Sequence, residues 1–118
     1  MRDYHKYEVW KKSHELVLYI YQDVLKLLPG EENYELARQF RRAAYSVPLN
    51  IVEGCGRSSD KDFAHFLDMA LGSIQEVEYC SLLLKDLDYI SEPRYQLLHQ
   101  KAGEVKAMLI ALIKSVRK

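Results

Sequence analysis

The chain has 118 residues, 48% of them hydrophobic and 29% charged, which fits one globular domain covering residues 1–118. Seventeen basic side chains balance seventeen acidic ones, so there is no bulk attraction for nucleic acid. The longest apolar run is far short of a membrane span, and the N-terminus is charged where a signal peptide is apolar. We therefore expect a cytoplasmic protein without a membrane partner.

Two cysteines, Cys55 and Cys80, fit a reducing compartment and make a structural disulfide unexpected. Two ligands cannot close a zinc site unaided, so we expect no metal and no cofactor. Cys55 lies between two glycines, where it is either an exposed, reactive thiol or simply a small residue in a tight turn.

The spacing of apolar residues predicts helices along the whole chain, with almost no strand-like alternation. The first helix is expected over about Tyr4 to Leu28, where a Pro-Gly pair ends it. The second starts near Asn33, a favourable N-cap, and runs toward Glu53, where two glycines end it.

Two more helices complete the prediction. Ser59 and Asp62 form a capping box that opens the third helix, which runs to about Asp88. Ser91 and Pro93 open the fourth, which runs to the end of the sequence. Because the connections are short, neighbouring helices should lie antiparallel, in an all-α, up-down-up-down four-helix bundle.

The third and fourth helices carry regular apolar seams, with alternating steps of four and three residues that are typical of left-handed packing at small crossing angles. The predicted seam residues are Phe63, Leu67, Ala70, Ile74, Val77, Ser81 and Leu84 in the third helix, and Leu98, Ala102, Val105, Leu109, Leu112 and Val116 in the fourth. Gly72 inside the third helix costs about 1 kcal/mol relative to alanine, which a close helix approach would justify.

The first helix has more apolar surface than one seam needs. One stripe contains Trp10, Val17, Ile20, Val24 and Leu27, and a second, rotated from it, contains Tyr7, Leu18, Tyr21 and Leu25. Scattered exposed apolar residues are common, so the second stripe is either incidental or packs against another subunit. We favour the subunit contact. The residues expected at an oligomer interface are Tyr7, Leu18, Leu25, Tyr45 and Leu49.

On a helical wheel, the second helix separates a core face from a basic face. Pro48 lacks an N–H and its ring clashes with the carbonyl of Ala44, so the helix should bend or loosen there, and Ser46 could satisfy a freed carbonyl. The residues expected in the core are Leu36, Phe40, Ala43, Val47 and Ile51. The residues expected on the opposite side are Arg38, Arg41, Arg42, Tyr45 and Leu49.

This basic face is either a solvated surface without a binding role or a surface with one of two binding roles. Arginine forks bind phosphates, and Tyr45 can stack on a base. Alternatively, the face docks on acidic groups of another chain. Nucleic-acid or partner binding is therefore assigned to Arg38, Arg41, Arg42, Tyr45 and Arg57.

The charges are segregated along the chain although their sum is zero. From Asp60 to Ile90, seven acids outnumber two lysines, a net charge of −5. From Arg94 to Lys118, six bases outnumber one acid, a net charge of +5. Opposite charge on two faces of one subunit suits a head-to-tail contact that closes into a ring.

Several segments resemble a known family: Trp10, then "LPGEENYELARQFRRAAYSVPLNIVEGCGR", "SSDKDFAHFLDMALGSIQEVEY" and "LDYI". The chain resembles the bacterial four-helix-bundle proteins encoded in intervening sequences of 23S ribosomal RNA genes, to which accessory proteins of diversity-generating retroelements are related. The resemblance implies a homopentameric barrel without catalytic activity. For the retroelement relatives it implies binding to a reverse transcriptase and, through a strongly basic barrel, to nucleic acid. This chain departs from that pattern in its zero net charge, so we expect RNA or DNA binding to be weak.

One short motif offers a different function. Arg94 and His99, separated by four residues on the last helix, resemble the motif of HEPN ribonucleases. In such a site the arginine would steady a phosphate, and the histidine would transfer a proton to or from the ribose 2′-hydroxyl. An R-x4-H match arises often by chance, so ribonuclease activity is kept as the alternative to a non-enzymatic interaction protein.

Overall fold

The computed structural model describes residues 1–32 and 34–118, and within these residues it contains helices and no strand. The N-cap expected at Asn33 lies outside the described residues, and the second helix begins at Leu36. The prediction of an all-α chain with four helices is confirmed. The four α-helices are α1 (Glu8–Tyr19), α2 (Leu36–Cys55), α3 (Asp60–Asp86) and α4 (Glu92–Val116).

The first helix is less regular than its sequence predicts. A separate 3-10 turn over Tyr4–Lys6 precedes α1. After α1, the chain continues as a π-helical turn over Ile20–Val24 and a 3-10 turn over Leu25–Leu27. A π-helical turn shifts the direction of the side chains that follow it, so a single 3.6-residue wheel does not describe this element.

Both serines cap the helices that they were predicted to open. The Ser59 Oγ accepts a hydrogen bond from the Asp62 N–H at 3.1 Å, and the Ser91 Oγ accepts one from the Arg94 N–H at 3.3 Å. Each serine therefore satisfies one of the free N–H groups of a helix start. Between α3 and α4, Asp88 has a φ of 63°, a left-handed conformation that aspartate tolerates better than most residues.

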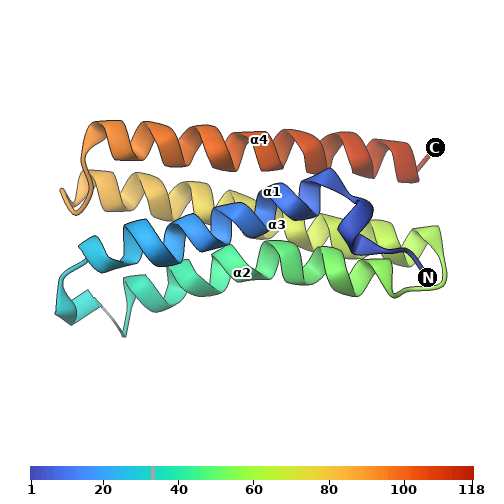
Figure 1. The fold of residues 1–118 in the computed structure, drawn as a ribbon, viewed down its shortest axis with the longest axis horizontal. Coiled ribbons are helices and arrows are strands. Elements are labelled where there is room, and N and C mark those ends of the chain that lie inside the picture. Colours follow the sequence, from blue (N-terminus) through green and yellow to red (C-terminus); the bar gives the residue numbers. More distant parts are fainter. Residues whose placement is uncertain (33) are drawn as a thin grey trace.

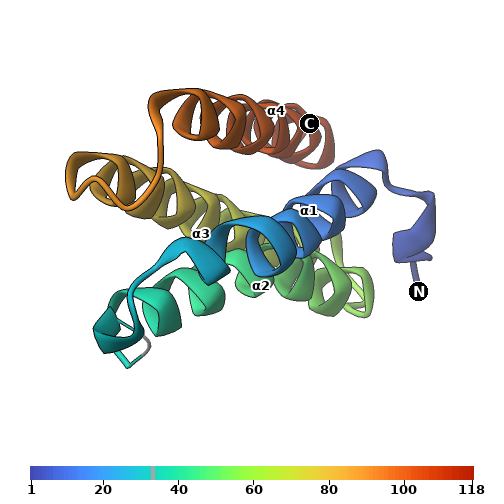
Figure 2. The same ribbon diagram turned by 60° about the vertical axis from the view of Figure 1, so that its left-hand side comes forward.

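Figure 1 shows the four helices side by side in an elongated molecule that measures 43 × 24 × 19 Å. The colours run from right to left along α1 and α3 and from left to right along α2 and α4. Both chain ends therefore lie at the right, beside the α2–α3 connection. Helix α3 packs against α2 and α4, and α1 packs against the same two helices; Figure 2 gives a second view of this order.

The core follows the predicted seams closely in α3, where all seven predicted residues are buried. In α4, four of the predicted six are buried, and Ile113 replaces Leu112 and Val116, which lie at the margin. In α2, four of the five predicted residues are buried and Leu36 is at the margin. The buried face of α2 is wider than predicted, because this helix contacts both α1 and α3. Its additional buried residues are Ala37, Ala44, Pro48, Gly54 and Cys55.

Proline does not interrupt α2. The α-helix extends unbroken from Leu36 to Cys55, with Pro48 buried inside it. The Ser46 Oγ donates to the Arg42 carbonyl at 2.6 Å, and the Asn50 Nδ2 donates to the Ser46 carbonyl at 2.8 Å. These side chains add local hydrogen bonds on both sides of the proline. Their acceptors are the Arg42 and Ser46 carbonyls, and not the Ala44 carbonyl, which loses its helical N–H donor at Pro48.

Candidate interaction surface

The outward side of α2 carries a straight row of exposed side chains. Arg38, Arg42, Tyr45 and Leu49 follow steps of four, three and four residues, so they lie along one line of the helix. Tyr45 and Leu49 retain 43% and 48% of their surface exposed. We call these four residues the α2 stripe. It combines two guanidinium groups with an aromatic and an aliphatic side chain.

Arg41 does not belong to this stripe. It is half-buried at the margin of the helix and already has an interaction partner within the protein. At 100° per residue, position 41 points about 100° away from position 42 and closer to the buried face. Arg41 is only about 60° from Arg38 around the helix, so it lies at the edge of the stripe, between the exposed row and the buried face.

Arg57 is also remote from the α2 stripe. It follows the end of α2, and its guanidinium carbon lies 4.6 Å from the centre of the Phe66 ring. The 13 residues of helix from Arg42 to the end of α2 at Cys55 correspond to about 20 Å. Arg57 thus covers an aromatic ring at one end of the bundle and lies outside the basic row.

Exposed apolar residues also occur on α1 and the turn that follows it, and α1 packs against α2. Leu18 is 41% exposed and Tyr21 is 43% exposed. Leu18 precedes the helical end at Leu27 by nine residues, and Tyr45 follows the start of α2 at Leu36 by nine. Leu18 and Tyr45 are therefore separated by equal numbers of residues from the two helical ends that the connection between these packed helices joins.

The other two predicted interface residues are partly covered by their own subunit. Tyr7 and Leu25 are half-buried and pack against the core. The Tyr7 ring lies edge-on to the Phe63 ring, with 5.8 Å between centroids. Of the apolar residues assigned to an interface, Leu18, Tyr45 and Leu49 remain open to a partner.

The segregated charges of α3 and α4 meet within the chain. The Lys106 Nζ lies 3.1 Å from a carboxylate oxygen of Glu78. The Arg117 guanidinium binds both carboxylate oxygens of Asp68, with 2.9 Å between Nη1 and Oδ1. Because α3 and α4 are packed neighbours, their opposite charges form ion pairs within the bundle. Part of the excess charge that suggested a head-to-tail contact between subunits is therefore already paired within one chain.

The seam between α1 and α4 contains polar contacts that the sequence did not reveal. The Arg94 Nη1 donates a hydrogen bond to the Tyr19 hydroxyl at 3.1 Å. The Lys101 ammonium lies 5.2 Å from the centre of the same ring. Residues 19 and 94 are far apart in the sequence, and no spacing rule connects them.

In the single chain, the two residues of the ribonuclease motif contact different partners. Arg94 is directed to Tyr19, whereas the His99 ring stacks on Tyr95 with 5.7 Å between centroids. Five residues along an α-helix correspond to a rotation of about 140°, so the two side chains point in different directions.

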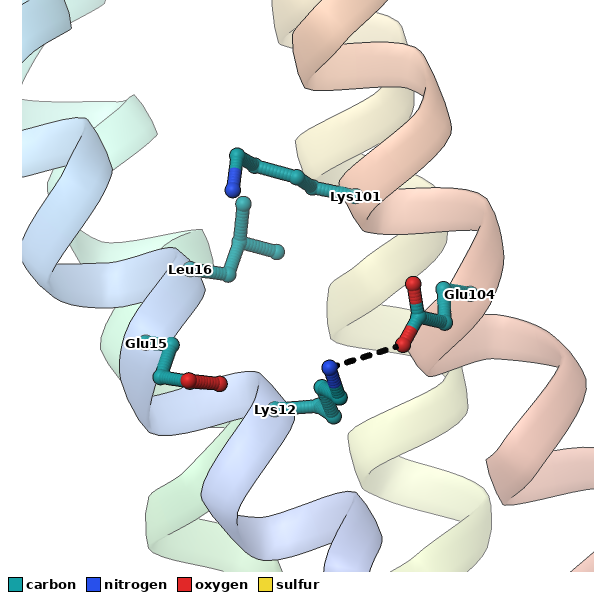
Figure 3. A pocket seen from close by; sticks show the side chains of 5 residues that line it. All are labelled: Lys12, Glu15, Leu16, Lys101 and Glu104. Atoms are coloured by element: carbon teal, nitrogen blue, oxygen red, sulfur yellow. Dashed lines mark ion pairs between the residues drawn. The ribbon is translucent and has the colours of Figure 1, made fainter.

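A small hollow with a mainly charged lining lies between α1 and α4 (Figure 3). The Lys12 ammonium is 3.2 Å from the Glu104 carboxylate across its floor. That hydrogen bond raises the pKa of Lys12. Since Glu15 and Lys101 complete the polar lining, the hollow contains two charges of each sign and selects no charged ligand.

The two cysteine thiols are covered in this fold. Cys55 and Cys80 are both buried, and burial raises the pKa of each thiol. The reading of Cys55 as an exposed thiol is therefore wrong: the last turn of α2 packs it into the core. Among the described residues, no group of three histidine, cysteine or acidic side chains could hold a metal ion, and no helix is long and apolar enough to cross a membrane.

These features define a small all-α protein of four helices. The chain belongs to the family of 23S rRNA-intervening sequence proteins, whose family model matches residues 5–111. It is similar to the crystal structure of a protein of unknown function from the S23 ribosomal protein family of Bacteroides thetaiotaomicron VPI-5482, with a TM-score of 0.82 and 31% identity over 90% of this chain and 95% of that chain. No curated protein matches the chain. The family resemblance inferred from the sequence is confirmed.

Proposed function

We propose that this chain is a non-enzymatic interaction protein of the 23S rRNA-intervening-sequence type, an antiparallel up-down-up-down bundle that assembles as a homopentameric barrel. The opposite directions of consecutive helices in Figure 1 support the antiparallel arrangement. The family resemblance is the reason for proposing five subunits. The surface of the single chain supports self-association.

The observation that carries the proposal is the apolar surface shared by α1 and α2. Leu18, Tyr21, Tyr45 and Leu49 are each more than 40% exposed although they belong to well-formed helices. Single exposed apolar residues are common, but a group of large ones on two neighbouring helices is typical of a subunit contact. The ion pairs between α3 and α4 reduce the contribution expected from charge, so the apolar surface has the larger role.

The assembly can be tested by placing a charge in this surface. We expect light scattering to give the mass of a pentamer for the wild-type protein. Leu18→Glu and Leu49→Glu should each lower that mass, because a carboxylate would be buried without a partner. Leu97→Glu, at an exposed leucine on α4, is the matched control and should leave the pentamer intact. A wild-type monomer at micromolar concentration would refute the assembly.

A nucleic-acid role for the same protein depends on the α2 stripe. Arg38 and Arg42 lie one turn apart and are exposed, and Tyr45 lies one turn further along the same line. This order suits contacts with phosphates followed by stacking on a base. Because the whole chain is neutral, we propose weak binding of RNA or DNA, or of a reverse transcriptase if the chain serves a retroelement.

Retention of RNA or DNA on immobilised protein tests this role. Retention should weaken steeply with salt, since bound phosphates release counterions. Arg42→Glu should reduce retention, whereas Lys114→Glu, which changes an exposed cation in the last turn of α4, should preserve most of it. Equal retention by wild type and Arg42→Glu, with the oligomer intact, would exclude the stripe as the binding site.

The proposal that the protein is not an enzyme has its own test. The different directions of Arg94 and His99 disfavour the ribonuclease alternative. We expect no cleavage of RNA by the purified wild-type protein. Cleavage that His99→Ala abolishes would overturn the non-enzymatic proposal and restore the alternative.

A further inference from the structure

We propose that residues 1–7, which we call the N-terminal strap, form a cover that closes one end of the core and opens as a unit while the four helices stay folded. The strap leaves the start of α1 and reaches the connection between α2 and α3, at the right-hand end of Figure 1. Neither the motifs nor the periodicity of the sequence indicate this contact.

Arg2 is the anchor of the strap. Its backbone N–H donates a hydrogen bond to the Cys55 carbonyl at 3.0 Å, and its Nη1 donates to the Arg57 carbonyl at 3.0 Å. Its Nη2 pairs with the carboxylate of Asp60. Its guanidinium carbon lies 4.3 Å from the centre of the Phe63 ring. One residue thus links the end of α2, the connection and the start of α3.

The rest of the strap has its own local structure, so it can move as one piece. The Asp3 carboxylate accepts a hydrogen bond from the His5 N–H at 3.0 Å and caps the 3-10 turn. The Tyr4 ring lies edge-on to Trp10 with 4.8 Å between centroids, and the His5 ring does the same at 5.3 Å. These contacts tie the strap to the first turn of α1.

The strap is held by the polar contacts of Arg2 near the surface and by half-buried aromatic rings at the margin of the core. None of residues 1–7 is buried, and the side chain of Asp60, the ionic partner of Arg2, is 74% exposed. Opening the strap removes the half-buried rings of Tyr4 and Tyr7 from the core margin, whereas unfolding the helices exposes the whole buried core. Segments of this kind open locally at a lower free energy than the whole protein unfolds.

Two buried cysteines provide a reporter and its internal control. Cys55 is 1% exposed, and its carbonyl is the acceptor for the Arg2 N–H, so the strap lies directly against it. Cys80 is 3% exposed and lies in the interior of α3. These are the only cysteines of the chain. A thiol reagent should reach Cys55 when the strap opens and Cys80 only when the bundle unfolds.

The experiment measures the rate at which iodoacetamide labels each cysteine in the folded protein, and mass spectrometry identifies the labelled site. The rate for each cysteine is then divided by the labelling rate of the same cysteine in the unfolded chain. We expect the wild-type protein to react faster at Cys55 than at Cys80. Arg2→Ala should raise the rate at Cys55 by about tenfold, as expected for the loss of hydrogen bonds from a charged group, without changing Cys80. Added salt should also raise the rate at Cys55, because it screens the exposed pair with Asp60.

Arg117→Ala is the matched control, because it removes another arginine–aspartate pair on α3, with Asp68. It should leave the rate at Cys55 unchanged. Arg2→Lys keeps the charge but loses the planar fork, so it should give an intermediate rate. Equal relative rates at Cys55 and Cys80 in the wild type and in Arg2→Ala would overturn the proposal, as would an equal effect of Arg117→Ala and Arg2→Ala on Cys55.

Discussion

Gly54 and Phe66 approach each other so closely that a Cβ added at position 54 would lie 2.9 Å from the Cβ of Phe66. The same Cβ would lie 3.0 Å from the Cδ1 of Phe63. Glycine therefore allows the end of α2 to press against the first turns of α3. Two guanidinium groups cover this corner, from Arg2 over Phe63 and from Arg57 over Phe66.

Gly54→Ala should accordingly destabilise the protein, although alanine is the better helix former. The added methyl group has no flexible neighbour that could yield, so we expect the free energy of unfolding to fall by about 1–3 kcal/mol. Urea denaturation measures this change. Gly72→Ala is the matched control, since a Cβ at position 72 meets nothing within 4 Å. It should raise stability by up to about 1 kcal/mol, and a similar loss in both variants would contradict the close approach.

Local periodicity explains why so much of the fold was predictable. The α3 seam and the serine caps depend on residues three and four apart, and every predicted α3 seam residue is buried. A close helix approach within this chain does not account for Gly72, because a Cβ there would meet nothing within 4 Å. The first helix was predicted as one continuous element because its π-helical turn at Ile20–Val24 has no sequence signal that periodicity can detect.

The candidate site was predictable only where exposure follows from the helical wheel. Leu18, Tyr45 and Leu49 are exposed as expected, whereas Arg41 lies at the margin of α2. The contacts that the sequence missed join residues far apart in the chain, such as Arg2 with Asp60. No rule of spacing brings such pairs together, because their proximity depends on how the helices pack.

Removing the Tyr19 hydroxyl tests the contribution of the polar seam between α1 and α4. Tyr19→Phe deletes the acceptor of the Arg94 hydrogen bond but keeps the ring beside Lys101. Since the contact is only partly buried, we expect a loss of about 1 kcal/mol or less in the free energy of unfolding. Tyr34→Phe, at an 83% exposed tyrosine, should change nothing. Equal losses in both variants would show that the seam contact contributes no stability.

The pair of Asp68 and Arg117 should make stability depend on pH in acid. Hydrogen bonding from Arg117 lowers the pKa of Asp68 below its ordinary value of 3.8, against a smaller opposing effect of burial. The ionised carboxylate is therefore favoured in the folded state, and its contribution is present above about pH 4 and lost as the pH falls below that value. We expect the urea midpoint of Asp68→Asn to fall less steeply than that of the wild type between about pH 5 and pH 3. Glu53→Gln, which removes an exposed carboxylate from α2, should follow the wild-type slope; a wild-type slope in Asp68→Asn would refute the role of the pair.

The Cys80 thiol should make the free energy of unfolding fall as the pH rises in alkali, whereas the pair of Asp68 and Arg117 makes it fall as the pH falls in acid. Burial raises the pKa of its thiol from 9.0 to about 11, so the folded protein holds this proton more tightly than the unfolded chain does. The associated stability is complete below about pH 9 and is lost as the pH rises toward 11, by up to about 3 kcal/mol. Cys80→Ala removes this titration, and its urea midpoint should therefore decline less than that of the wild type between about pH 8 and pH 10.5. Because tyrosines titrate in the same range in both proteins, the informative quantity is the difference between the two slopes. Identical slopes would mean that the Cys80 thiolate forms as readily inside the bundle as in the unfolded chain.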